Sequence, residues 1–401
     1  MTNQSRRKPG ATAEAVAGLL SLAVAMGIGR FAFTPMLPLM ANAELLTVAQ
    51  GSWLAAANYV GYFGGALVAS RVRFDAARLA TVSLVLIACS TAAMAVPGAA
   101  AWMTLRLVAG ACSAWVFVAT SVWCLGALSS LQRTDLGAWV YSGVGAGIAA
   151  AGLHCLLAAV SGVRPDVLWI QLGILAAALS LPVMLVIRQV PAADVPGGAR
   201  GPGHAKLPAG TVGLVVSYGI MGYGYILPAT FLPLLARNLV TDPAVFGWAW
   251  PIFGLTAAAS TLAAGMAMKR RSRLQVWTVC QLLMGMGALV PSLWSHPAAI
   301  VLSAVLVGGT FMVITLAGVQ EIRARAGENA AQWVGYLTAS FALGQIAGPV
   351  ASSLLLVHPG LGRSALDLGL QSAAILLFLS SAWLWRQANP SRIAKEMQDA
   401  G

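Results

Sequence analysis

The segment MGIGRFAFTPMLPLMA, residues 26–41, returns later in the chain as MGYGYILPATFLPLLA, residues 221–236. The two segments align without gaps at an offset of 195 residues and share an MGxG beginning and an LPLxA end. Two tryptophan matches have nearly the same offset: Trp53 with Trp248, and Trp139 with Trp333. Several matches at nearly one offset indicate that the chain consists of two related halves.

The composition is that of a membrane protein. Hydrophobic residues make up 59% of the chain and charged residues 9%, against about 25% charged residues in soluble proteins. A spanning helix needs roughly 20 predominantly apolar residues, and such runs recur along the whole chain. We therefore expect an all-α membrane protein with twelve transmembrane helices, at residues 13–40, 48–70, 79–96, 101–129, 136–160, 165–189, 210–236, 243–268, 274–293, 297–322, 331–357 and 365–385.

The basic residues predict how these helices are oriented. Of the 24 Lys and Arg, 19 lie in the two termini or in loops after even-numbered spans. Only Arg164, Arg237 and Arg363 lie in loops after odd-numbered spans. Basic loops face the cytoplasm, so both termini are expected there, in a multi-pass protein of a bacterial inner membrane. The net charge of +12 is thus a topology signal and does not indicate a nucleic-acid partner.

A polar segment divides the chain near its middle. Residues 190–208, VPAADVPGGARGPGHAKLP, hold four prolines and four glycines and cannot span a membrane. We expect a cytoplasmic linker here, between a six-helix half at 1–189 and a second at 209–401. Two such pseudo-symmetric halves are typical of secondary transporters, which bind their substrate near the midplane between the repeats.

Two motifs carry a resemblance to a known family. The first span has the form GxGRFAxxPxLP, and the fourth contains RxxxG within LRLVAGACSA, from Arg106 to Gly110. Over its whole length the chain resembles the major facilitator superfamily, and its first span is similar to the YbfB/YjiJ-type branch. The resemblance implies a monomer that works by rocker-switch alternating access, with Arg106 and Gly110 in coupling or gating. The alternative for Arg106 is that its side chain snorkels to the outer membrane surface. The loop GALVASRVRFDAAR, residues 65–78, departs from the GxxxDRxGRR pattern of the superfamily.

Arg30 is the unusual residue of the first span. It precedes Met40 by ten residues, roughly 15 Å along a helix, which places it near the midplane. An arginine there costs about 3 kcal/mol on insertion scales and stays protonated. It must therefore face a protein partner, a wet cavity or an anion. Two roles remain open, a direct contact with substrate and a structural contact with carbonyl groups that the nearby prolines free.

Further polar residues are candidates for the same site. Tyr225 occupies the position equivalent to Arg30 in the second half, so we expect the two to face each other across a central cavity. The predicted substrate-binding residues are Arg30, Thr34, Asn58, Tyr218, Tyr225 and Gln345. For Asn58 and Gln345, and for Gln281, hydrogen bonding between helices is the competing interpretation. For Tyr218 and Tyr225 it is packing in the core.

Glycines and prolines predict an interrupted first helix. Proline removes a backbone donor and disturbs a helix, and exposed backbone groups at membrane depth are tolerated where they line a cavity. The candidate hinge residues are Gly27, Gly29, Pro35, Pro38, Pro228 and Pro233.

Acidic residues are missing from the central stretches of the spans. Glu321 lies at the end of the tenth span, where Arg323 and Arg325 are the expected partners. His154 is the one titratable side chain well inside a span, and it is either a site for a coupling proton or a packed histidine. Buried arginines without buried acids predict a net-positive interior that favours anions.

The leading hypothesis is a secondary transporter for a small solute, an organic anion such as a carboxylate. One alternative is an exporter of lipophilic or drug-like compounds, including cations, and a more remote one is a sensor or scaffold that transports nothing. No GxSxG, HExxH or GxxxxGK[ST] motif occurs, so neither an enzyme nor a nucleotide-driven pump is expected. The five cysteines lie inside spans without CxxC spacing, and no metal or cofactor is expected.

Overall fold

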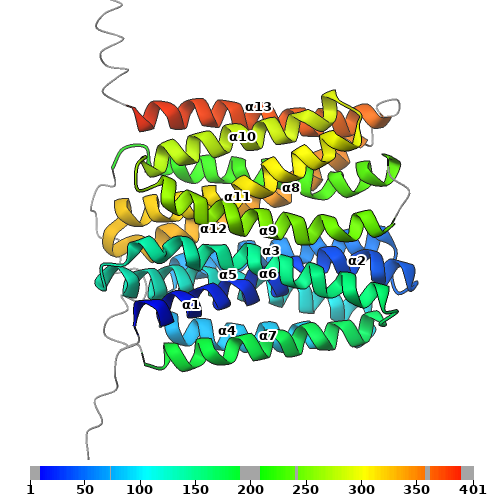
Figure 1. The fold of residues 1–401 in the computed structure, drawn as a ribbon, viewed down its shortest axis with the longest axis horizontal. Helices are drawn as coiled ribbons and strands as arrows, with labels where there is room; N and C mark the ends of the chain where they lie inside the picture. Colours follow the sequence, from blue (N-terminus) through cyan, green and yellow to red (C-terminus); the bar gives the residue numbers. More distant parts are fainter. Residues whose placement is uncertain (1–9, 73, 190–207, 240–242, 357–361, 390–401) are drawn as a thin grey trace, which may run out of the picture.

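The computed structural model describes residues 10–72, 74–189, 208–239, 243–356 and 362–389 (Figure 1). Within these ranges all regular structure is helical. The first half of the chain holds α1 (Ala11–Leu22), the π-helix η1 (Ala23–Phe31), α2 (Phe33–Asn42), α3 (Val48–Arg71), α4 (Ala76–Ala93), α5 (Ala99–Ser130), the 3₁₀ turn η2 (Thr134–Leu136), α6 (Gly137–Val160) and α7 (Pro165–Ile187). The second holds α8 (Thr211–Leu239), α9 (Pro243–Ala267), α10 (Arg273–Leu293), α11 (Pro297–Ala326), the 3₁₀ turn η4 (Gly327–Asn329), α12 (Ala330–Leu356) and α13 (Gly362–Ala388).

The predicted all-helical membrane fold is confirmed. Ten described segments are long and apolar enough to cross a membrane. One of them, Pro297–Gly348, contains most of both α11 and α12, and α3 adds a further helix of 24 residues. Within the described ranges the helices thus make twelve passages, each within a few residues of its predicted span. Polar caps mark the beginnings of α3 and α10, where Thr47 and Ser272 each form a capping box.

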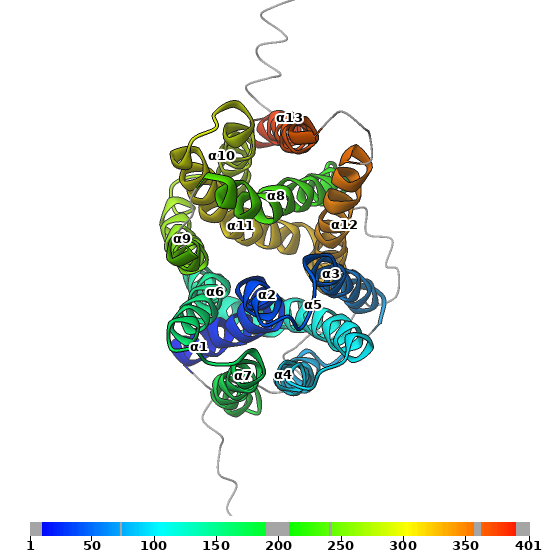
Figure 2. The ribbon, with the colours of Figure 1, turned by 90° about the vertical axis from the view of Figure 1, so that its right-hand side faces the viewer.

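The helices run side by side in two groups. Figure 2 looks along the helices and shows α8 to α13 gathered in one group, the second, and α1 to α7 in the other, the first. Where the two groups meet, α6 packs along α9 and α3 packs along α12. Most of the predicted linker lies outside the described residues.

The first passage is not interrupted at its prolines, which corrects the prediction of a discontinuous helix. α1, η1 and α2 follow one another, and the irregular part is the π-helix, which begins twelve residues before Pro35. Pro35 stands in the first turn of α2 and Pro38 within α2. In the second half, Pro228 is buried within α8. Pro233 also lies in α8, at a point where the structure does not describe side chains.

The π-helix and Pro35 together leave a backbone carbonyl open. A π-helical hydrogen bond joins residues five apart in the chain. In that register the donor for the carbonyl of Arg30 would be residue 35, and proline has no N–H. The carbonyl must then find another donor, because unpaired buried backbone groups are rare.

A close backbone contact holds the π-helix against α6. A Cβ atom built on Gly27 would lie 2.4 Å from the Cα of Gly147, far inside van der Waals contact. Neither position can therefore carry a side chain without a shift of the backbone. The close contact between the two backbones accounts for a glycine at position 27. The role of Gly27 as a hinge remains a prediction.

The last turn of α11 makes the predicted ion pair. Glu321 accepts a hydrogen bond from Arg325 at 2.8 Å and lies 3.6 Å from Arg273. Arg323, the other expected partner, points elsewhere and donates to the carbonyl of Ser121 on α5. Arg323 therefore ties the second helix group to the first.

Candidate functional site

Arg30 lies where the two groups of helices meet. Its position near the end of η1 directs the side chain toward α12, and only 2% of the residue is exposed. There the guanidinium Nη2 donates a hydrogen bond to Oε1 of Gln345, which is fully buried. The structure thus joins two predicted site residues that are 315 positions apart in the sequence.

Aromatic rings surround the guanidinium group. Its central carbon lies 3.8 Å from the ring centroid of Tyr62, the geometry of a cation–π contact. The rings of Phe31, Tyr59 and Phe341 lie between 5.4 and 5.7 Å from the same carbon. Sequence reasoning missed all four. The available signal was the position of Tyr62, one helical turn after the candidate Asn58.

Three nitrogen atoms of this pair are left without partners. Nε and Nη1 of Arg30 and Nε2 of Gln345 are buried and have no hydrogen-bond partner among the described residues. Leaving a buried donor unpaired costs about 1–3 kcal/mol, and more for a charged group. An anion with several oxygen acceptors could satisfy such donors.

Arg106 serves the backbone of the first helix. Its Nη1 donates to the carbonyl of Gly29 and its Nη2 to the carbonyl of Arg30, each at 3.2 Å. The guanidinium carbon also lies 4.6 Å from the ring centroid of Phe33. Arg106 therefore supplies the donor that Pro35 cannot.

Two interpretations from the sequence are corrected by this contact. Snorkelling of Arg106 to the membrane surface is excluded, because the residue is 4% exposed and its two terminal nitrogens bind carbonyls. The carbonyl-binding role considered for Arg30 belongs to Arg106, since the guanidinium of Arg30 instead reaches Gln345.

Asn58 and Gly110 hold α3 and α5 together next to Arg106. The Asn58 side chain donates to the carbonyl of Arg106 at 3.0 Å. A Cβ on Gly110 would lie 2.1 Å from the carbonyl oxygen of Asn58, so the two backbones touch. Asn58 thus contacts the helix that carries Arg106, and no hydrogen bond joins it to Arg30.

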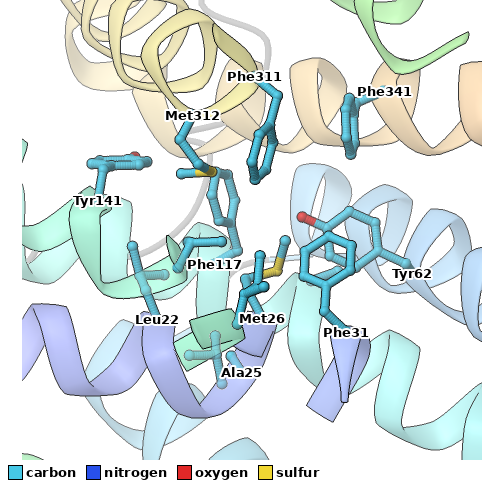
Figure 3. Packing of buried hydrophobic residues seen from close by; sticks show 14 of the residues in the cluster. Leu22, Ala25, Met26, Phe31, Tyr62, Phe117, Tyr141, Phe311, Met312 and Phe341 are labelled. Atoms are coloured by element: carbon cyan, nitrogen blue, oxygen red, sulfur yellow. The ribbon is translucent and has the colours of Figure 1, made fainter. Parts of the chain in front are cut away.

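Aromatic side chains from both groups pack beside Arg30. Figure 3 shows Phe311 and Phe341 on one side facing Phe31 and Tyr62 on the other. The ring of Tyr225 stacks on Phe311 at 5.0 Å and meets Phe31 edge-on at 6.4 Å, and its place opposite Arg30 across a cavity remains a prediction. We call this set the aromatic cluster, and its members are Phe31, Tyr225, Trp250, Phe253, Phe311 and Phe341.

Other predicted site residues form no described hydrogen bond to Arg30. The ring of Tyr218 lies 5.4 Å from that of Phe341, tilted by 38°, and its hydroxyl donates to Thr315 at 3.0 Å. Thr34 and His154 are half-buried, and neither forms a described hydrogen bond to Arg30. Gln281 forms hydrogen bonds between helices, as in the competing interpretation.

One buried acid was missed. Glu14, one turn into α1, is 2% exposed, and its Oε2 has no hydrogen-bond partner among the described residues. Packing of α1 against α5 and α6 buries it, because Cys124 donates to the Glu14 carbonyl and Gly18 abuts Val140. The prediction that the membrane interior has no buried acid is therefore wrong at this end of the first span. No described acidic side chain pairs with Arg30 or Arg106.

Comparison with known proteins places this fold and site in a family. No curated protein matches the sequence. Among solved structures, the human organic anion transporter MFSD10 (TETRAN) matches with a TM-score of 0.69 at 12% sequence identity, over 96% of this chain and 100% of that one. At that identity the likeness shows the fold, which is that of the major facilitator superfamily. The family profile described as "Uncharacterised MFS-type transporter YbfB" matches residues 22–384. The chain therefore belongs to this MFS family, whose members are multi-pass membrane transporters and not enzymes.

Proposed function

We propose that this protein is a secondary transporter that moves a small organic anion across a bacterial inner membrane by alternating access. The binding site would lie between the six-helix halves at residues 1–189 and 209–401, joined by the linker at 190–208. One observation carries the proposal: at the meeting point of the two helix groups, Arg30 and Gln345 have three buried nitrogens with no hydrogen-bond partner among the described residues.

The charge of the site supports an anionic substrate. A buried cation is stable only when it is paired or well hydrogen-bonded. Arg30 donates to Gln345, and no described acidic side chain pairs with it. A bound carboxylate would supply both the missing charge and the missing acceptors.

The Arg30–Gln345 contact links binding to movement of the halves. A carboxylate that takes the guanidinium donors competes with Oε1 of Gln345, the acceptor from the opposite group. Binding would thus weaken a bond that holds the groups together. Arg106 and Gly110 would support this step by fixing the first helix, while proton coupling through His154 remains a prediction.

Transport in proteoliposomes tests the proposal. Arg30→Gln removes the charge and should reduce carboxylate uptake by 10- to 100-fold, because a hydrogen bond to a charged group contributes about 1.5–3 kcal/mol and 1.4 kcal/mol corresponds to a factor of ten. Arg30→Lys should recover little, since an ammonium group cannot form the bidentate contact. Arg164→Gln is the matched control, because Arg164 pairs with Asp166 at 2.8 Å outside the spans and is largely exposed. Wild-type uptake by well-folded Arg30→Gln would refute the proposal.

Export of lipophilic compounds is the second candidate function. The apolar side chains around the site favour it, with Met26, Phe117 and Met312 beside the aromatic cluster (Figure 3). In that case lipophilic compounds would move equally well in wild type and in Arg30→Gln, and carboxylates would not move at all.

A further inference from the structure

We infer that the anion taken at Arg30 is a monocarboxylate with a flat aromatic body. The inference rests on the proposed function and narrows it to one chemical class. It combines the number of guanidinium groups open to a ligand with the arrangement of the aromatic rings next to them.

The site offers one guanidinium group to a ligand. Arg106 directs both of its terminal nitrogens at the carbonyls of Gly29 and Arg30, and among its nitrogens Nε alone lacks a partner in the described residues. Arg30 has both Nε and Nη1 without a described partner, so it is the cation that can take a carboxylate in a two-bond contact. A second carboxylate on the ligand would be buried without such a contact, which is unfavourable. Dicarboxylates and phosphate dianions therefore fit poorly.

The wall beside Arg30 is built of stacked rings. From Tyr225 the stack continues to Phe311 at 5.0 Å, then to Phe253 at 5.4 Å and Trp250 at 5.3 Å. The planes of these neighbours differ by 28°, 23° and 6°, so ring faces meet ring faces. Such offset stacking favours flat aromatic surfaces over aliphatic ones of similar size.

The place for a ligand ring is the junction between the two helix groups. Phe31, on the first passage, meets Tyr225 and Trp250 edge-on, each at 6.4 Å. These contacts cross between the groups, whereas the stack from Tyr225 to Trp250 lies within the second group. Parting of the groups would expose the face of the stack, and a ligand ring could replace Phe31 against it. Phe31 follows Arg30 directly in the chain. A ligand ring in the place of Phe31 would therefore bring the ligand carboxylate close to the guanidinium of Arg30.

Ligand binding to the purified wild-type protein tests the inference without any variant. The probes are benzoate, cyclohexanecarboxylate, terephthalate and tetraphenylphosphonium, with affinity followed by quenching of tryptophan fluorescence and by thermal unfolding. We expect benzoate to bind about tenfold more tightly than cyclohexanecarboxylate, which differs in lacking the aromatic ring. Terephthalate, with a second carboxylate on the same ring, should bind at least tenfold more weakly than benzoate.

Tyr225→Leu tests the stack itself. It should lower the affinity for benzoate about tenfold and leave that for cyclohexanecarboxylate within a factor of two or so. Tyr336→Leu is the matched control, because Tyr336 contacts Trp333 on α12 and lies outside the aromatic cluster.

The outcomes separate this inference from the proposed function. Equal affinity for benzoate and cyclohexanecarboxylate, or tighter binding of terephthalate, would overturn the aromatic monocarboxylate and leave organic anion transport standing. Binding of tetraphenylphosphonium with no binding of any carboxylate would overturn both.

Discussion

Replacing Arg106 should weaken anion binding at a site that Arg106 does not occupy. Arg106→Gln removes two charge-assisted hydrogen bonds to the carbonyls of Gly29 and Arg30, each about 1.5–3 kcal/mol. The release of a desolvated charge offsets part of that loss. The π-helical register should therefore lose a net stabilisation of about 1.5–3 kcal/mol. The register decides which residues of the first helix face α12, so its loss would turn Arg30 away from Gln345.

The assay is anion binding to the purified protein, with thermal unfolding as a check on folding. We expect a fall in affinity of about tenfold to a hundredfold in Arg106→Gln, since 1.4 kcal/mol corresponds to a factor of ten. Arg106→Lys should recover part of the affinity, because an ammonium group cannot span two carbonyls as the planar guanidinium does. Arg133→Gln is the control, as Arg133 forms an exposed pair with Asp135. Wild-type affinity in a folded Arg106→Gln would refute the reasoning.

Two other predictions concern contacts between helices. Gly27→Ala should destabilise the protein by about 1–3 kcal/mol, since the new Cβ would overlap the backbone of Gly147. Gly126→Ala, with nothing within 4 Å of the new atom, should not lower the unfolding temperature, and equal behaviour of the two variants would contradict the close approach. Arg323→Gln removes the bond from α11 to the carbonyl of Ser121 on α5 and should lower the unfolding temperature, because a contact between the two groups is lost. An unchanged unfolding temperature would show that this bond does not hold the groups together.

Much of the architecture could be predicted from the sequence because the bilayer imposes simple rules. A passage needs about twenty apolar residues, so the run at 101–129 predicts α5, observed at Ala99–Ser130. The repeat at residues 26–41 and 221–236 predicts two related halves. The rarity of charge inside membranes also pointed to Arg30 and Arg106 as special.

The tertiary structure decided what each of these residues contacts. Gln345 was a candidate without a known partner. Only the tertiary structure shows that it accepts a hydrogen bond from Arg30. The ring of Tyr62 on the guanidinium and the burial of Glu14 likewise depend on neighbours remote in sequence. The amino-acid composition of Ala23–Phe31 does not distinguish a π-helix from an α-helix. Side chains from α5 donate hydrogen bonds to carbonyls of this segment, and those donors are remote in sequence. Hydrophobicity is a property of each segment and can be summed along the chain, whereas hydrogen-bond and ring contacts depend on the position and rotation of one helix relative to another.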